Sequence, residues 1–175
     1  PVEFSGVLRE EQRQTVNEVV SMFKAGVLGG IVQAKPGWGK TVVALAIAAR
    51  LGVPTLVVVH KEFLMDQWKD RIAKFLPGAS IGHVQQGVCD FHGRSVVMGM
   101  VHSLAGADYP PEFYEWPGLV ITDEVHRISA RTWSVVPAKF RARWRLGFTA
   151  TPRRKDAADG VFWNHIGPIL FAGKE

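Results

Sequence analysis

The sequence predicts an α/β fold built on a mostly parallel, doubly wound sheet. Short apolar stretches alternate along the chain with stretches of helical periodicity, which is typical of this class. The stretch 55–59 is β-branched and apolar on both faces, as in a parallel strand that helices cover on each side. A length of 175 residues with 47% hydrophobic residues suits one domain with a core of its own.

The order of the elements follows from periodicity and from glycine and proline punctuation. Trp68 lies on the apolar stripe of one expected helix, together with Leu64 and Ile72. Helices are expected over residues 9–24, 39–51 and 61–76 and around 130–136, and strands over 28–33, 55–59, 80–84, 95–98, 119–122 and 145–149.

Composition excludes several classes of protein. Uncharged apolar runs fall short of the roughly 18 residues that a membrane span needs. A single cysteine, Cys89, cannot form an intrachain disulfide, and the sequence does not open like a signal peptide. We therefore expect an intracellular protein, cytoplasmic or nucleoid-associated, with no membrane partner.

Positive charge is concentrated in one part of the chain. The formal net charge is only +5, yet the stretch 127–155 holds basic residues and no acidic ones. Such a cluster can be a solubilising face or a contact for a polyanion, and charge alone does not decide between them. Its members are Arg127, Arg131, Lys139, Arg141, Arg143, Arg145, Arg153, Arg154 and Lys155.

Residues 34–41 match the phosphate-loop (Walker A) pattern A/G-x-x-x-x-G-K-[ST] between an expected strand and an expected helix. Glycines at 37 and 39 let backbone N–H groups turn toward an anion at the positive end of the helix dipole. Lys40 then meets the β and γ phosphates, and the Thr41 hydroxyl is a ligand for Mg²⁺. The alternative is a glycine-rich turn with a surface lysine. The loop reads Ala34-Lys35-Pro36-Gly37-Trp38-Gly39-Lys40-Thr41, in which Trp38 fills space.

In a second motif, two carboxylates directly follow the strand that is expected over residues 119–122. Asp123 is the candidate to hold Mg²⁺, and Glu124 is the candidate to orient or deprotonate the attacking water. Open α/β sheets bind ligands at this edge. The alternative is a polar strand end that caps the next helix.

Together with Leu146-Gly-Phe-Thr-Ala-Thr-Pro152, these motifs resemble the N-terminal RecA-like domain of superfamily 2 helicases of the DEAD/DEAH type. The resemblance implies a three-layer RecA-like P-loop NTPase domain over residues 1–175, with the second RecA-like domain absent from the chain. Gln67-Trp68, the D-E-x-H form and the segment 166–171 are similar to the group that contains type III restriction translocases and the xeroderma pigmentosum group B helicase. That group acts on DNA, so DNA is favoured over RNA.

The resemblance also implies roles for single residues. Leu8-Arg9-Glu10-Glu11-Gln12 is similar to the family's L-R-x-x-Q, in which Gln12 reads adenine beside Arg9; a polar residue at an exposed helix start is the alternative. His126 joins the γ-phosphate side to the motif formed by Thr149 and Thr151, or is an ordinary polar side chain. Nucleic-acid contacts fall at His60, Lys61, Met100 and His102, although His60 and Met100 replace residues that are common in the family.

The function that this implies is an ATP- and Mg²⁺-dependent helicase or translocase. In the family a second lobe supplies arginine fingers, so the lobe alone is expected to hydrolyse ATP weakly. The alternatives are a nucleotide-gated binding switch without translocation, an RNA helicase, and a P-loop phosphotransferase, which the acid pair and residues 149–151 argue against.

Overall fold

The structure is a computed structural model that describes residues 2–124, 136, 138–150 and 169–172. From residue 10 to residue 85 the described elements alternate between helices and strands, as the sequence predicts. In chain order they are α1 (Glu10–Lys24), β1 (Gly29–Gln33), α2 (Lys40–Leu51), β2 (Thr55–Val59), α3 (Glu62–Phe75), β3 (Ile81–Gln85), β4 (Val88–Cys89), β5 (Val96–Met100), α4 (Val101–Gly106), α5 (Pro111–Glu115), β6 (Leu119–Thr122), β7 (Trp144–Thr149) and β8 (Ile169–Ala172).

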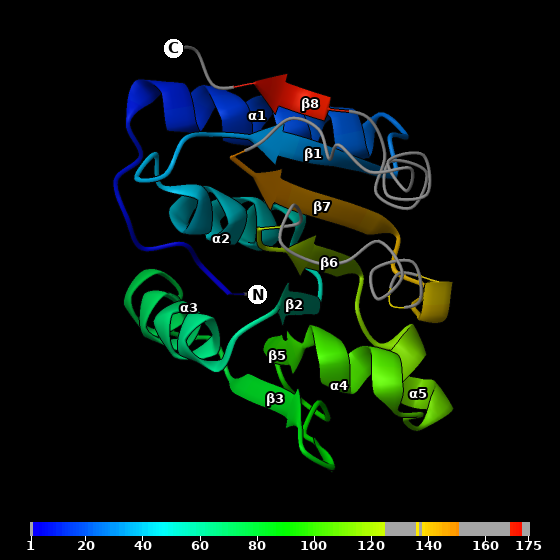
Figure 1. The fold of residues 1–175 in the computed structure, drawn as a ribbon. Coiled ribbons are helices and arrows are strands. Elements are labelled where there is room, and N and C mark those ends of the chain that lie inside the picture. The colour runs from blue at the N-terminus through cyan, green and yellow to red at the C-terminus, as the bar shows by residue number, and fades with distance from the viewer. Residues whose placement is uncertain (1, 125–135, 137, 151–168, 173–175) are drawn as a thin grey trace.

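One sheet runs through the molecule, and its described strands lie in the order β4-β3-β5-β2-β6-β7-β1-β8 (Figure 1). All pairs are parallel except β3 with β4. The carboxyl ends of β1 and β6 therefore open on the same edge, separated by β7. This confirms the doubly wound parallel sheet, and it brings the phosphate loop and the acid pair to one edge.

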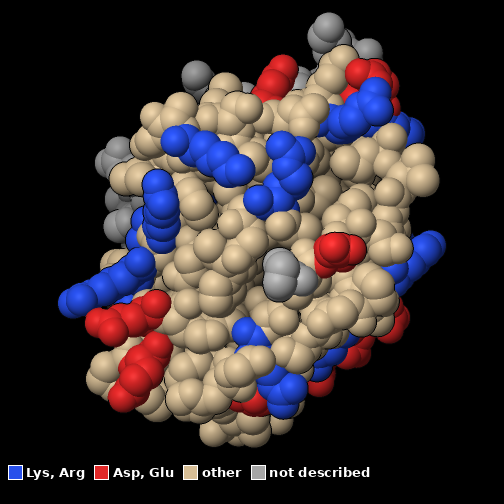
Figure 2. All heavy atoms as spheres, turned by 180° about the vertical axis from the view of Figure 1, so that it is seen from behind, with Lys and Arg blue, Asp and Glu red and all other residues tan. Residues whose placement is uncertain are grey.

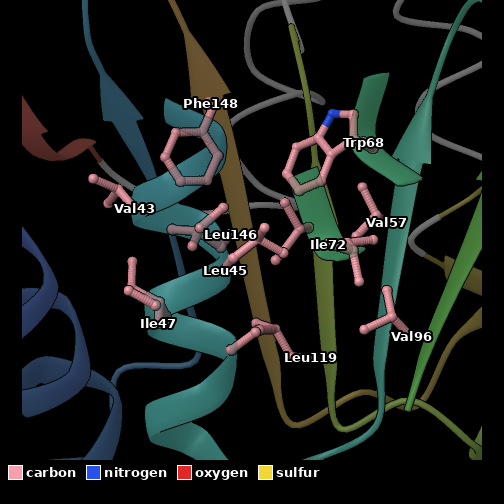
Figure 3. Packing of buried hydrophobic residues seen from close by; sticks show 14 of the residues in the cluster. Val43, Leu45, Ile47, Val57, Trp68, Ile72, Val96, Leu119, Leu146 and Phe148 are labelled. Atoms are coloured by element: carbon pink, nitrogen blue, oxygen red, sulfur yellow. The ribbon is translucent and has the colours of Figure 1, made fainter. Parts of the chain in front are cut away.

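The first face of the sheet is covered by α1, α2 and α3. Alternate strand residues point into this layer, among them Val57 of β2, Leu119 of β6 and Leu146 of β7. Figure 3 shows that they meet the apolar sides of α2 and α3, including Leu45 and Ile72. Helix α2 is buried along most of its length because it lies between its neighbours and the sheet.

The second face carries α4, α5 and the segment that contains Val136 and Phe140. The intervening strand residues, such as Leu56, Val58 and Val120, point to this side. Phe113 of α5 lies at its centre, with ring centroids 5.2 Å from Phe91 and 5.3 Å from Phe140. Helices on both faces give the three layers that the resemblance implied.

The sequence placed most element ends to within one or two residues. Helices α1, α2 and α3 begin one residue later than expected because Arg9, Gly39 and Lys61 are the N-cap residues, which lie outside the helix. The short elements β4, α4, α5 and β8 lie outside the expected ranges. The helix expected around 130–136 lies outside the described residues except for Val136, which is helical.

Strand β4 is an element that the sequence did not predict, and its turn explains why. It follows β3 through a turn in which Gln86 and Gly87 have φ angles of +50° and +84°. Two positive φ angles in a row are the signature of a tight hairpin turn that is usually formed by Asn-Gly or Asp-Gly. Glutamine at the first position conceals this signal in the sequence.

The described basic residues of the stretch 127–155 have contacts within the chain. Lys139 Nζ donates to the carbonyl of Leu104 at 3.2 Å, and Arg141 pairs with Glu115 at 3.2 Å. Arg145 donates to the carbonyl of Phe140 at 2.8 Å, and burial lowers the pKa of its guanidinium.

These contacts attach the segment before β7 to its neighbours, so this part of the predicted basic face has a structural role. Arg127, Arg131, Arg153, Arg154 and Lys155 lie outside the described residues. Seen from behind, the described Lys and Arg side chains are spread over several places, some of them beside Asp or Glu (Figure 2). Among the described helices, none combines the length and the apolar character needed to cross a bilayer.

Candidate nucleotide and nucleic-acid site

The phosphate loop connects β1 to α2 along a turned backbone. Gly37 and Gly39 have φ angles of +80° and +95°, and Gly39 is the N-cap of α2. Other residues adopt such angles only at a cost, so the sequence needs glycine at these positions. The loop places backbone N–H groups at the positive end of a helix, which is an arrangement that binds anions. Lys40 and Thr41 follow as the first two residues of the helix.

The start of α1 is bonded to this loop. Gln12 Oε1 accepts a hydrogen bond from the backbone N–H of Arg9 at 2.9 Å, and Gln12 Nε2 donates to the carbonyl of Trp38 at 2.8 Å. The Arg9 guanidinium donates to the same carbonyl at 2.5 Å. Gln12 is only 6% exposed, so it is not the exposed polar residue of the alternative interpretation.

A side chain at residue 39 would disturb this contact, because a Cβ there would overlap Gln12 Nε2. Glycine at this position therefore meets two requirements: the left-handed backbone and the close approach of Gln12. The adenine contact of Gln12 stays a prediction.

The acid pair lies directly after β6. The backbone N–H of Asp123 donates to the carbonyl of Val58 at 3.1 Å, and the Asp123 side chain is largely buried. Glu124 has a φ angle of +47°, which a residue with a side chain rarely adopts. Strained backbone of this kind is concentrated at functional sites, because surrounding contacts must hold it in place.

Two side chains from the β2–α3 segment face this acid pair. Trp68 of α3 donates its indole N–H to Asp123 Oδ2 at 3.0 Å in a buried hydrogen bond. His60 Nε2 lies 3.9 Å from Glu124 Oε2 at the end of β2. The acid pair is therefore held by residues more than fifty positions earlier in the chain.

A cavity of about 310 Å³ lies where these elements meet. Thr41 lines it from the start of α2, Asp123 from the end of β6 and Trp68 from α3, with Gln67, Asp70 and Arg71 completing the wall. The hydroxyl of Thr41 and the carboxylate of Asp123 are hard oxygen ligands, which Mg²⁺ prefers.

The described residues include no group of three or more His, Cys, Asp or Glu side chains that could hold a metal by themselves. A site with two protein ligands still fits Mg²⁺, because this ion keeps several waters and binds substrate phosphates. Another cavity, of about 210 Å³, lies at the opposite edge of the sheet; Val2, Val53 and Val96 are among the residues that line it, and it contains no charged side chain.

The predicted nucleic-acid residues lie at the carboxyl ends of two neighbouring strands. Because Val59 pairs with Met100 between β2 and β5, the segment with His60 and Lys61 lies beside the start of α4, which contains His102. Lys61 and His102 are exposed, whereas His60 is mostly covered and faces Glu124. The structure thus brings the two segments together.

Sequence reasoning missed Phe63 in this region. Its side chain is 55% exposed, and Lys61 Nζ lies 5.9 Å from the centre of its ring. An exposed aromatic beside a lysine is a surface on which a base can stack. Its place in a helical stretch gave no sign of this exposure.

Thr149 is buried at the end of β7, and its carbonyl accepts the N–H of Ala34 at the start of the phosphate loop, at 2.9 Å. This position fits a link to the loop rather than a direct contact with a strand of nucleic acid. His126 and Thr151 lie outside the described residues. The hydrogen bond of Trp68 to Asp123 was also missed, because the place of Trp68 in the apolar stripe predicted packing alone.

The parallel sheet, the phosphate loop and the acid pair define a RecA-like ATPase domain of the helicase type. A family profile described as "Type III restriction enzyme, res subunit" matches residues 5–154. The chain belongs to this ResIII family, and the resemblance to superfamily 2 helicases is confirmed.

The names of two similar proteins, a helicase and a translocase, are consistent with this family. Over 167 residues, 95% of the chain, it is 35% identical to L396 of Acanthamoeba polyphaga mimivirus, which is named as a candidate ATP-dependent RNA helicase. Over 142 residues, 81% of the chain, it is 34% identical to the DNA 3'-5' translocase XPB2 of Sulfurisphaera tokodaii. The chain spans 32% of the first protein and 31% of the second.

A solved structure shares the fold. The SWI2/SNF2 ATPase core of Sulfolobus solfataricus in complex with dsDNA matches with a TM-score of 0.79 at 18% identity, over 95% of this chain and 37% of that one. At this identity the likeness shows the fold alone.

Proposed function

We propose that residues 1–175 are the first RecA-like lobe of an ATP-dependent helicase or translocase that moves on DNA. The convergence of Thr41 and Asp123 on one cavity carries this proposal. Five strands (β2 to β6) and three helices (α3 to α5) lie between the two residues along the chain, yet both residues line the same cavity. Such a meeting of a phosphate loop and a strand-end carboxylate is what hydrolysis of a nucleoside triphosphate needs.

Each residue of the site has a distinct role in this proposal. Lys40 and the loop amides of residues 37–41 would neutralise the phosphates, and Thr41 with Asp123 would hold Mg²⁺. Bound Mg²⁺ offsets the charge that develops on the phosphate oxygens. Glu124 orients the attacking water and takes up its proton, as a general base near a phosphoryl centre does.

The remaining loop residues complete the nucleotide site. Lys35 and Pro36 form the exposed rim of the loop, and Trp38 packs against the first core layer while its carbonyl is held by Arg9 and Gln12. Because Gln12 and Arg9 both donate to the carbonyl of Trp38, adenine bound by these residues would act directly on the conformation of the phosphate loop. His126 and Thr151, with Thr149, keep their proposed roles in coupling the nucleotide to the strand.

Turnover requires a second lobe in this proposal. In other phosphoryl-transfer enzymes an arginine supplied from outside the phosphate loop raises the rate on the order of 10³- to 10⁵-fold. The lobe alone should bind ATP but hydrolyse it slowly, and it should not unwind a duplex. Closing and opening of two lobes around ATP would move the protein along the strand.

DNA is proposed as the substrate because the group resemblance is to DNA-acting proteins. The contacts through Lys61 and His102 would go mainly to phosphates, so binding should weaken as salt rises and depend little on sequence. Triplex displacement by the two-lobed protein tests this: displacement driven by ATP supports translocation. ATP-dependent binding without displacement would indicate a switch, and activity on RNA alone would indicate an RNA helicase.

The nucleotide site itself is tested by Lys40→Ala. Removing this ammonium should lower ATP affinity by on the order of 100-fold, the size of a lost charge-assisted contact of about 3 kcal/mol. Binding of a fluorescent ATP analogue measures the change, and Lys24→Ala, at the end of α1, is the matched control because it removes a lysine far from the loop. Equal affinity of the Lys40→Ala and Lys24→Ala variants would refute the nucleotide site.

A further inference from the structure

The hydrogen bond between Trp68 and Asp123 connects helix α3 to the acid pair. We propose that Trp68 is a positioning residue that orients the Asp123 carboxylate, and that α3 thereby sets the affinity of the site for Mg²⁺. This inference rests on the proposed ATPase function, because it assigns the metal to Asp123.

Among the described residues, the indole N–H of Trp68 has one hydrogen-bond partner, Asp123. Trp68 is 2% exposed, and its indole has a single donor and no acceptor. That donor lies 3.0 Å from Asp123 Oδ2, whose residue is itself only 8% exposed. A hydrogen bond to an ionised carboxylate is stronger than one between neutral groups, and burial strengthens it further.

Packing fixes the indole before any metal arrives. Trp68 belongs to the first core layer with Ile72 and Val57, and Figure 3 shows its ring among these side chains. A ring held in this way holds the carboxylate in turn, with one oxygen engaged and the other left as the ligand. Partners that orient a metal-binding carboxylate commonly change metal affinity by about 10- to 100-fold when they are removed.

Helix α3 also connects the site to the proposed nucleic-acid turn. Lys61 is the N-cap of this helix, and Trp68 follows it by seven residues, about two turns or roughly 10 Å along the axis. A strand bound at Lys61 and Phe63 would therefore act on the same rigid element that holds Asp123. Through this helix, nucleic-acid binding can alter Mg²⁺ affinity without any new contact to the nucleotide.

The chain offers a matched control for Trp68→Phe. Trp144 is also buried, and its indole donates to the carbonyl of Phe23 at 3.2 Å, away from the acid pair. Trp68→Phe and Trp144→Phe each remove one buried indole donor and keep an aromatic ring. Both should lose some stability, but only Trp68→Phe should affect the metal.

The experiment measures how much Mg²⁺ this chain needs for half-maximal binding of a fluorescent ATP analogue, and its affinity for the analogue in EDTA. Trp68→Phe should need about 10- to 100-fold more Mg²⁺, while its affinity in EDTA stays that of the unsubstituted chain. Trp144→Phe should match the unsubstituted chain in both. An unchanged Mg²⁺ requirement in Trp68→Phe, or an equal increase in Trp144→Phe, would overturn the inference.

A second measurement does not depend on the folding of Trp68→Phe or on nucleotide. In ¹⁵N-tryptophan NMR the chain gives six indole signals, and Trp68 is assigned by removing the other tryptophans in turn. Asp123→Ala should shift this signal and speed the exchange of its proton with solvent. An unchanged signal would refute the hydrogen bond.

The two outcomes separate the inference from the proposed function. If the unsubstituted chain binds no nucleotide, the proposed function fails, and the role in Mg²⁺ affinity fails with it, even where the indole signal responds to Asp123→Ala. If the chain binds Mg²⁺ and nucleotide normally but Trp68→Phe changes neither, the proposed function stands and the inference alone is wrong.

Discussion

The phosphate loop and the acid pair are proposed to bind the same ligand, but they are built in different ways. The loop is organised mainly by local backbone: two glycines with positive φ angles at the start of α2. The acid pair is organised by distant side chains, because Trp68 and His60 reach it from the β2–α3 segment. A local motif can be recognised in the sequence, whereas contacts between distant segments of the chain become visible only in the fold.

The largest effect should come from Glu124, the carboxylate proposed as the general base. In the two-lobed protein, Glu124→Gln keeps the shape of the side chain but removes the base, so kcat should fall by about 10²- to 10⁴-fold while ATP affinity stays unchanged. Steady-state ATP hydrolysis and equilibrium nucleotide binding measure the two parts. Turnover at the normal rate would show that Glu124 is not the base, and the acid pair would then be a structural turn.

A smaller effect should come from breaking the loop. Gly39→Ala places a side chain at a φ angle of +95° and against Gln12, whereas Gly52→Ala meets a φ angle of +66° with open space around it. Gly52→Ala should cost about 1 kcal/mol of unfolding free energy for the left-handed backbone alone. Gly39→Ala should cost more and also weaken nucleotide binding.

Thermal unfolding and nucleotide binding of the two variants measure this difference. Gly39→Ala should cost less in a Gln12→Ala background than in the unsubstituted chain, because the overlap is then absent and only the backbone part remains. If the Gly39 and Gly52 variants lost equal stability, and Gly39→Ala cost the same in both backgrounds, the close approach of Gln12 would not contribute to the free energy of unfolding.

The smallest effect is expected at Cys89, on the edge strand β4 far from both regions. Burial, with a smaller contribution from Asp90, raises the pKa of this thiol. At neutral pH it should therefore carry less thiolate than an ordinary cysteine and react slowly with iodoacetamide, faster as the pH rises. Nucleotide should leave the rate unchanged, and acceleration by ATP would show that the site influences the whole sheet.

The sequence predicted the layers of the fold, and the edge of the sheet that holds the site, well because their signals are local. Periodicity and β-branched runs set α1, α2, β2 and β6, and a phosphate loop has a fixed spacing. What it missed depends on contacts between distant segments. Trp68 was predicted only to pack, since its partner Asp123 is brought to it by the sheet order, and the hairpin at Gln86 uses an uncommon residue.

The buried positions of Gln12 and Thr149 could not be predicted for the same reason. Gln12 is covered because the start of α1 folds onto the carbonyl of Trp38, and Thr149 because β7 lies between its neighbours. The register of β2 and β5 brings His60 and Met100 close together, and this proximity could not be predicted from the sequence either.

The central claim is that the phosphate loop and the acid pair bind one Mg²⁺·nucleotide. Paramagnetic broadening tests it most directly: Mn²⁺ in place of Mg²⁺, with a non-hydrolysable ATP analogue, erases NMR signals of nearby amides. The signals of Gly39–Thr41 and of Asp123 should vanish together, and only when both analogue and Mn²⁺ are present. Broadening of one segment without the other would contradict a shared site.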